Sequence, residues 1–488
     1  MKSIKLLIFC LLIPGIARVN AFNDSIQPIP EILNLDLPLF DFPSIRYSTE
    51  SGIRRTLDQT SDLAVNKKVK DYFLSYENLS MQQALAITED LHSTNYYLQN
   101  KLWNRILPVS QPNKKIFNRI GANVSSGIID YLLAYQIMIF SPVWLHEEFH
   151  RSGLTLQGIG SHNDTYYRFG TRSTDAGGSV SKIRDEDLIR FKANDPTGFV
   201  RTHSSGIESQ YYLLRKLQMG NFFEAKQYPI VAMNILLTNA AVNYVNQFKR
   251  DDYDSIIDSM NVRGTNPSDR DYVGWDFTAW VYDLFRADQP YTERGTHPLG
   301  NGINRIIKRS QLSDTEYDYL VKMSRMQYLN YISPAMIGID RIRLNDQWAF
   351  NVSMRHILTS FGYDLSLDLF LDHRGNQWLF SLHNYKNFST NFPGLEIWRK
   401  DLFPKLKKEN LSIDLRTMLW LQPQNQLFLT DKSQVGGLLG LKATGKISNR
   451  LQYYLDLEAK SDGWVAASPY LDKSISFRAG LNYNVSQN

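Results

Sequence analysis

The chain has 488 residues, a formal net charge of +5 and a single cysteine. Its 54 Lys and Arg nearly balance its 49 Asp and Glu, and no basic cluster offers a phosphate-tracking face. The composition therefore argues against a nucleic-acid partner, and the length allows two or three domains.

Residues 1–21 are typical of a secretory signal peptide. Two lysines precede the apolar core Leu6–Ile13, which is too short to span a bilayer, and Val19-Asn20-Ala21 is a small-x-small cleavage pattern. Cys10 lies inside this segment, so the mature chain would carry no cysteine and a formal charge of +2. A secreted eukaryotic protein of this size usually carries disulfides, and we therefore expect export to a bacterial periplasm or outer membrane.

The next two regions differ in composition and in hydrophobic periodicity. Residues 22–65 are rich in Pro, Asp and Ser without a sustained period, which predicts an extended lead-in. Over residues 66–335 the apolar residues recur with a mostly helical period, broken by polar loops such as 160–178. The clearest helical runs are Met81 to Ser93, Ser125 to Arg151, Ser205 to Met219, Tyr228 to Phe248 and Ser313 to Tyr331.

Residues 336–488 change to a period of two, which predicts antiparallel strands. Eight strands are expected, four clear and four weaker: 363–371, 411–421, 451–459 and 475–485, then 338–344, 347–357, 377–386 and 434–446. Many are longer than the strands of ordinary soluble sheets, and each pairs an apolar face with a charged one. This pattern fits a small outer-membrane β-barrel, and it also fits a soluble antiparallel sheet with one wet face. The expected fold class is α+β, with a helical domain followed by this barrel or sheet.

One helix in the first of these domains carries the chemistry. Ser141 and Pro142 predict its start as N-cap and first helical residue, and Gly153 predicts its end. His146 and His150 are four residues apart, so their imidazoles project from one face and can bind one Zn²⁺. Glu147 lies next to the first ligand, where its carboxylate can take a proton from a metal-bound water.

The pattern His146-Glu147-Glu148-Phe149-His150 resembles the active-site helix of the zincin metallopeptidases. The resemblance covers this helix alone. It implies that His146 and His150 bind zinc and that Glu147 is the general base or acid of peptide hydrolysis. The other interpretation is a core or surface helix with two incidental histidines.

The third ligand has several candidates. The metzincin branch of the zincins continues with Gly and a third His; Gly153 matches the Gly, but Leu156 stands where the His is needed. A Glu from a later helix, as in the gluzincins, is then expected, and Glu208 is the best candidate. Glu208 could equally form a capping box with Ser205. His203, His162 and Glu224 remain as further candidates.

A donor near the developing oxyanion is also needed, and His203, Tyr272, Arg294 and His297 are unranked candidates. We expect a zinc-dependent peptidase of the bacterial cell envelope that acts on a peptide or protein substrate and is fixed to the outer membrane. The alternatives are a non-enzymatic outer-membrane barrel with a structural metal or none, and a zinc hydrolase of non-peptide substrates.

Overall fold

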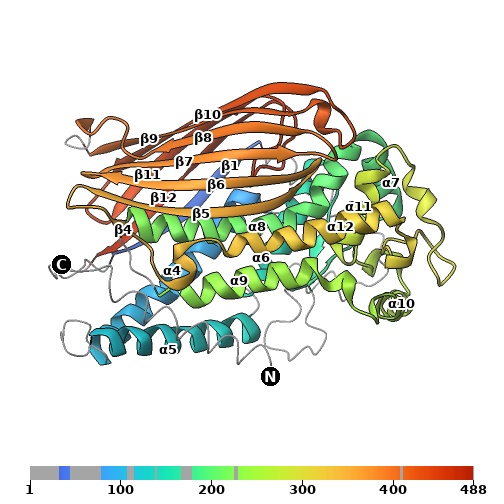
Figure 1. The fold of residues 1–488 in the computed structure, drawn as a ribbon, viewed down its shortest axis with the longest axis horizontal. Helices are drawn as coiled ribbons and strands as arrows, with labels where there is room; N and C mark the ends of the chain where they lie inside the picture. The colour runs from blue at the N-terminus through green and yellow to red at the C-terminus, as the bar shows by residue number, and fades with distance from the viewer. Residues whose placement is uncertain are drawn as a thin grey trace.

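The structure is a computed structural model that describes residues 32–43, 79–106, 115–137, 140–165, 178–224, 229–406 and 410–486. The predicted signal peptide and most of the predicted lead-in lie outside these residues. Figure 1 shows a curved sheet forming one layer and a group of helices packed beneath it and beyond one end of its strands.

The helices occupy the chain between the lead-in and the sheet. Helix α8 lies directly beneath the sheet, and α7 and α10 lie beyond one end of the strands, at the right of Figure 1. Their bounds are α4 Met81–Ile106, α5 Lys115–Gln136, α6 Pro142–Leu156, α7 Asp185–Asn194, α8 Pro196–Phe223, α9 Val231–Val245, α10 Tyr253–Arg263, α11 Asp276–Phe285 and α12 Asp314–Met326. None of the described helices combines the length and the apolarity needed to cross a membrane.

The sheet contains ten antiparallel strands in the order β1-β12-β11-β10-β9-β8-β7-β6-β5-β4. Their bounds are β1 Ile32–Phe42, β4 Ile342–Arg343, β5 Trp348–Thr359, β6 Gly362–His373, β7 Asn376–Lys386, β8 Asn391–Arg399, β9 Leu411–Pro423, β10 Ser433–Lys446, β11 Leu451–Lys460 and β12 Ser474–Ser486. Its edge strands, β1 and β4, are not paired with one another in the described residues, so the sheet is open. A separate two-stranded sheet joins β2 (His162–Asn163) to β3 (Val180–Ser181).

The predicted combination of N-terminal helices and a C-terminal antiparallel sheet is confirmed, and closure into a barrel is not shown. All eight predicted strands form, and the sheet gains two more. Strand β8 escaped prediction because Pro393 and Gly394 interrupt its alternation. Strand β1 comes from the segment expected to be a lead-in and pairs with β12.

Helix boundaries differ more from expectation than strands do. The run from Ser125 to Arg151 divides into α5 and α6, and Gly153 lies inside α6 rather than after it. Helix α8 begins at Pro196, with the Asp195 side chain accepting from the Gly198 N–H. The predicted capping box of Ser205 and Glu208 is therefore wrong, because both residues lie in the middle of a helix.

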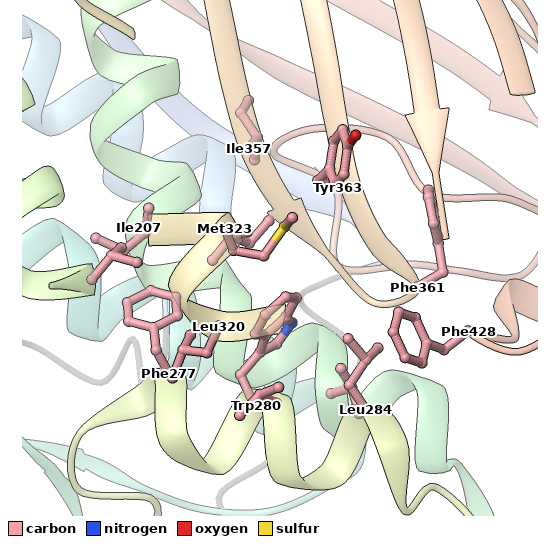
Figure 2. Close-up of a cluster of buried hydrophobic side chains, with 14 of the residues drawn as sticks. Ile207, Phe277, Trp280, Leu284, Leu320, Met323, Ile357, Phe361, Tyr363 and Phe428 are labelled. Atoms are coloured by element: carbon pink, nitrogen blue, oxygen red, sulfur yellow. The ribbon is translucent and has the colours of Figure 1, made fainter. Parts of the chain in front are cut away.

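The largest of the apolar clusters joins the helices to the sheet. Ile207 of α8, Trp280 of α11 and Leu320 of α12 are buried against Ile357 of β5 and Tyr363 of β6. Figure 2 shows these side chains converging where the strands end. The Trp280 indole N–H also donates to the Thr359 carbonyl at 3.0 Å, which fixes α11 to that end of the sheet.

Candidate metal centre

Helix α6 starts as its sequence predicts. The Ser141 hydroxyl accepts from the Val143 N–H at 3.2 Å, and Pro142 occupies the first turn, where its missing N–H costs nothing. The helix packs against α8, and Gly153 allows the approach: a Cβ there would lie 2.7 Å from the Thr202 hydroxyl oxygen. Residues Trp144 through Thr155 are all buried, so the motif lies in the interior.

Three side chains from two helices converge beside α8. The His146 Nε2 lies 2.9 Å from an Asp276 carboxylate oxygen, and the His150 Nε2 lies 3.3 Å from the same oxygen. Ligand atoms about 2.0–2.1 Å from one tetrahedral zinc are about 3.3 Å apart, so this spacing is close to that of a zinc site. Among the described residues, these three alone form a group of metal-binding side chains whose ligand atoms all lie within 4.8 Å.

Both imidazoles have partners at Nδ1, on the side of the ring away from Asp276. The His150 Nδ1 lies 2.7 Å from the Thr202 carbonyl, which can only accept, so this nitrogen carries the proton. The His146 Nδ1 lies 3.4 Å from the Gln210 amide group, and its Nε2 is within hydrogen-bonding distance of Asp276. Partners of this kind orient the histidines of metal sites.

Helix α8 leaves room in front of the two histidines. A Cβ added to Gly206 would lie 2.3 Å from the His146 Nε2 and 2.5 Å from the His150 Nε2. Any other residue at this position would fill the space that the two nitrogens face. The His150 Nε2 is also buried without a hydrogen-bond partner. Both observations match a small occupant held between α6, α8 and α11.

Charge at the site is dominated by carboxylates. Burial raises the pKa of Glu147 well above its usual range, and the neighbouring Asp271 and Asp276 raise it further. Burial and the charge of Asp276 likewise raise the pKa of Asp271 to about 7. Asp276 differs: burial alone would raise its pKa, but His150 and His146 outweigh burial and hold it below its usual value. Burial and mutual repulsion therefore disfavour the simultaneous ionisation of these acids, and a bound cation would make their ionisation easier.

Glu147 is packed closely against the segment that precedes β3. A Cβ added to Gly178 would lie 2.6 Å from a Glu147 carboxylate oxygen, so the segment leading into β3 passes directly over this side chain. The adjacent Glu148 points elsewhere, accepting from Arg151 at 2.7 Å and from the Asn163 amide at 2.9 Å. Of the two consecutive glutamates, only Glu147 shares the surroundings of Asp276.

Glu208, nominated from the sequence as third ligand, lies elsewhere. Its carboxylate accepts from Arg201 at 2.7 Å and from the Ala467 N–H at 2.5 Å, which joins α8 to the loop between β11 and β12. The structure brings Asp276, not Glu208, to the two histidines. Glu224 pairs with Lys400 at 3.4 Å, and His162 lies 3.3 Å from Asp164.

The candidate oxyanion donors are also accounted for. His203 and Arg294 both contact Asp283, which Lys192 joins at 2.7 Å. The Tyr272 hydroxyl lies 2.8 Å from the His150 Nδ1, on the side of the ring opposite Asp276. The His297 Nδ1 accepts from the Leu299 N–H at 3.2 Å, in its own loop.

Sequence reasoning missed Asp276 and Tyr244. Asp276 and Asp283 are the two acids of an otherwise apolar helix and are seven residues apart, hence on one face. Each of these aspartates contacts a buried histidine of another helix. The seven-residue spacing of two acids on one apolar helix is the sequence signal that could have identified them. The Tyr244 ring lies 5.3 Å from that of His146, and its hydroxyl accepts from the Asp276 N–H at 3.4 Å.

Comparison with protein-family models, curated proteins and solved structures gave no match. Any function assigned to this chain therefore rests on the geometry of the site.

Proposed function

We propose that this chain is a zinc-dependent peptidase whose metal ligands are His146, His150 and Asp276. The observation that carries the proposal is the convergence of two imidazole nitrogens and one carboxylate oxygen on a space that Gly206 keeps clear. Two histidines and one carboxylate form a known catalytic zinc set, and this set leaves a coordination position open. A structural zinc would normally have four protein ligands, so three favour catalysis.

Zinc in such a site acts as a Lewis acid that polarises a carbonyl and acidifies water. The protein supplies the proton transfers. In our proposal, Glu147 accepts a proton from the attacking water and returns it to the leaving amine. Its neighbours support this role, because a carboxylate surrounded by Asp271 and Asp276 holds a proton more readily than an isolated one.

The peptide bond as substrate is implied only by the resemblance of the α6 motif to zincins. A zinc hydrolase of esters or non-peptide amides would use the same residues. Assays on peptide, ester and cell-wall amide substrates separate these activities.

We also propose that the chain is exported and works at a bacterial outer membrane, with residues 66–335 as the metal-binding domain and residues 336–488 as a barrel-like membrane domain. The non-enzymatic alternative keeps that membrane domain and gives the metal a structural role or none. Support for the membrane location comes from the outer face of the sheet, which is independent of the metal centre.

Zinc content tests the ligand set. We expect about one zinc per chain in the wild type, measured by elemental mass spectrometry, and loss of that zinc in His150→Ala and Asp276→Asn. Glu208→Gln is the matched control and should retain the metal. If Glu208→Gln loses zinc while Asp276→Asn keeps it, the proposed ligand set is wrong. A folded wild type that takes up no zinc would remove the proposal altogether.

A further inference from the structure

The two faces of the sheet have the reverse of the polarity expected for a protein in water. The inner face, against which α8 packs, carries charged residues that are buried, among them Asp368, Glu396 and Arg355. The outer face carries leucines that are exposed. Leu382 is 59% exposed and Leu419 is 66% exposed.

Apolar residues on the outer face form continuous rows across the strands. Leu367 of β6 is the cross-strand neighbour of Leu382, Leu382 of Leu395, and Leu395 of Leu419. A similar pair lies on β10 and β11, where Leu441 is the cross-strand neighbour of Leu457. Large exposed apolar surfaces of this extent mark a site of contact with another apolar phase.

Charge is excluded from the same face. From β6 to β12, the outward positions inside the strands contain no Asp, Glu, Lys or Arg; Lys386 and Arg399 occupy outward positions only as the last residues of β7 and β8. The aromatic side chains Trp378 and Tyr453 also lie toward one end of this band. An uncharged band with aromatic and charged residues at its margins is the pattern of a lipid-facing strand surface.

The inner face explains how the charges can be turned away from the solvent. Arg215 of α8 contacts Glu396 at 2.7 Å, and a cavity of about 280 Å³ lies between α4, α8 and the sheet. Its lining includes Arg416, Glu458 and Arg478. Polar groups thus face a polar interior filled largely by helices, while apolar groups face outward.

We infer that the outer face of β6 to β12 is embedded in the acyl-chain region of a lipid bilayer. Strands of 9 to 14 residues match the roughly 9–11 residues that a tilted strand needs to cross the hydrocarbon. A second copy of the chain is the competing occupant. It would cover only part of a face that curves through seven strands, whereas lipid covers all of it (Figure 1).

The position of the metal centre follows from this inference. Trp280, one helical turn after Asp276, contacts the last residue of β5, and Arg201 at the start of α8 contacts the Ser468 carbonyl in the β11–β12 loop. Helix α11 and the N-terminal part of α8 are therefore attached to one rim of the sheet. This inference does not depend on hydrolysis, and a chain without zinc would leave it unchanged.

Site-specific labelling in vesicles tests the embedded face. The full chain with Cys10→Ser as background receives single cysteines by Leu382→Cys, Leu419→Cys or Leu439→Cys, each labelled with an environment-sensitive fluorophore. Asp346→Cys and Lys432→Cys, which are exposed in loops at opposite rims, are the controls. The proteins are refolded from denaturant with phosphatidylcholine vesicles that carry nitroxide in mid-acyl chain.

We expect several-fold stronger quenching at the three leucine positions than at the two loop positions. Equal quenching at all five positions, or a folded chain that stays in the aqueous phase, would overturn the inference. A blue-shifted label without acyl-chain quenching, together with a dimer in solution, would show that a second copy covers the face instead.

Discussion

Charged side chains are buried in several regions of the molecule, and two of these regions differ most: the inner face of the sheet and the surroundings of α6. On the sheet the charges neutralise one another: Glu396 contacts Arg215 at 2.7 Å and Arg416 at 2.8 Å, and Arg416 reaches Glu458 at 3.2 Å. Beside α6 three acids, Glu147, Asp271 and Asp276, have no ion pair with Lys or Arg in the described part of the chain.

We interpret the paired charges of the sheet as structural and the acids beside α6, which lack Lys or Arg partners among the described residues, as functional. A buried charge with a well-placed partner fixes the geometry of a fold, because removing the partner is costly. Buried acids without cations are costly as they stand, and a bound metal lowers that cost. The first arrangement is compensated within the protein, and in our proposal a bound metal compensates the second.

Replacing Glu147 by Gln gives the largest expected effect. The amide keeps the size of the side chain but cannot accept the proton, so hydrolysis should fall by about 10²–10⁴-fold. Zinc content and thermal stability should stay at wild-type values, because the side chain at this position is not a metal ligand in the proposed set. The measurement is kcat/KM on the best substrate found, alongside zinc per chain. Full activity in this variant would exclude Glu147 as the proton acceptor.

The second prediction concerns the buried ion pairs on the inner face of the sheet, and it tests whether those charges compensate one another. Arg416→Met leaves Glu396 and Glu458 with fewer partners in a buried setting, and we expect a loss of about 3–5 kcal/mol in the free energy of unfolding. Lys442→Met is the control. Lys442 is one-third exposed and lies 3.8 Å from Asp36, so its loss should cost about 1 kcal/mol or less.

Denaturant unfolding of the two variants in the same lipid or detergent gives both values. Equal effects would mean that the buried partners of Arg416 do not depend on it. The charges of the inner face would then not be mutually compensating.

Gly206→Ala is expected to weaken zinc binding. The new methyl group would occupy the space between the two Nε2 atoms, so zinc affinity should fall by at least the 10–100-fold typical of changes around a metal site. Gly440→Ala, whose Cβ would meet nothing closer than 3.6 Å, is the control for a glycine replacement. Competition with a chelator measures the affinity. Unchanged affinity in Gly206→Ala would place the metal elsewhere.

The sequence predicted the local parts of this arrangement. Alternation in residues 336–488 is a local property, and all eight strands expected from it are present. Strand β1 was missed because its alternation of Leu33, Leu35 and Leu37 is short and breaks at Pro38, where the register with β12 shifts. Whether the sheet closes depends on the pairing of its edges, and no local pattern contains that information.

The candidate site also contains residues that local spacing predicts and residues that depend on how the helices pack. His146, Glu147 and His150 share one helix, so spacing alone placed them on one face. Asp276 reaches them from α11, a helix far along the chain, and its approach depends on how α11 packs against α6 and α8. Glu208 was favoured because α8 was expected to begin near Ser205. The helix begins at Pro196 instead, so it also contains Arg201, which lies seven residues before Glu208 and donates to its carboxylate.

Asp130 is a buried carboxyl group that is hydrogen-bonded to uncharged side chains. Its replacement has the smallest of the predicted effects. Asp130 is a residue of α5 that faces α4, where Asn95, Tyr96 and Gln99 donate to it, and no Lys or Arg of the described residues pairs with it. Burial raises its pKa to about 7, so the folded chain holds a proton that the unfolded chain has lost.

The sign follows from that difference in proton binding. The folded state binds more protons than the unfolded state between about pH 4 and pH 7, so Asp130 lowers stability as the pH rises through this window. Asp130→Asn keeps the size of the side chain and removes the titration. From pH 5 to pH 7, the wild type should therefore lose on the order of 1–2 kcal/mol relative to the variant. Parallel pH dependence of unfolding in the two proteins would show that Asp130 stays ionised when buried.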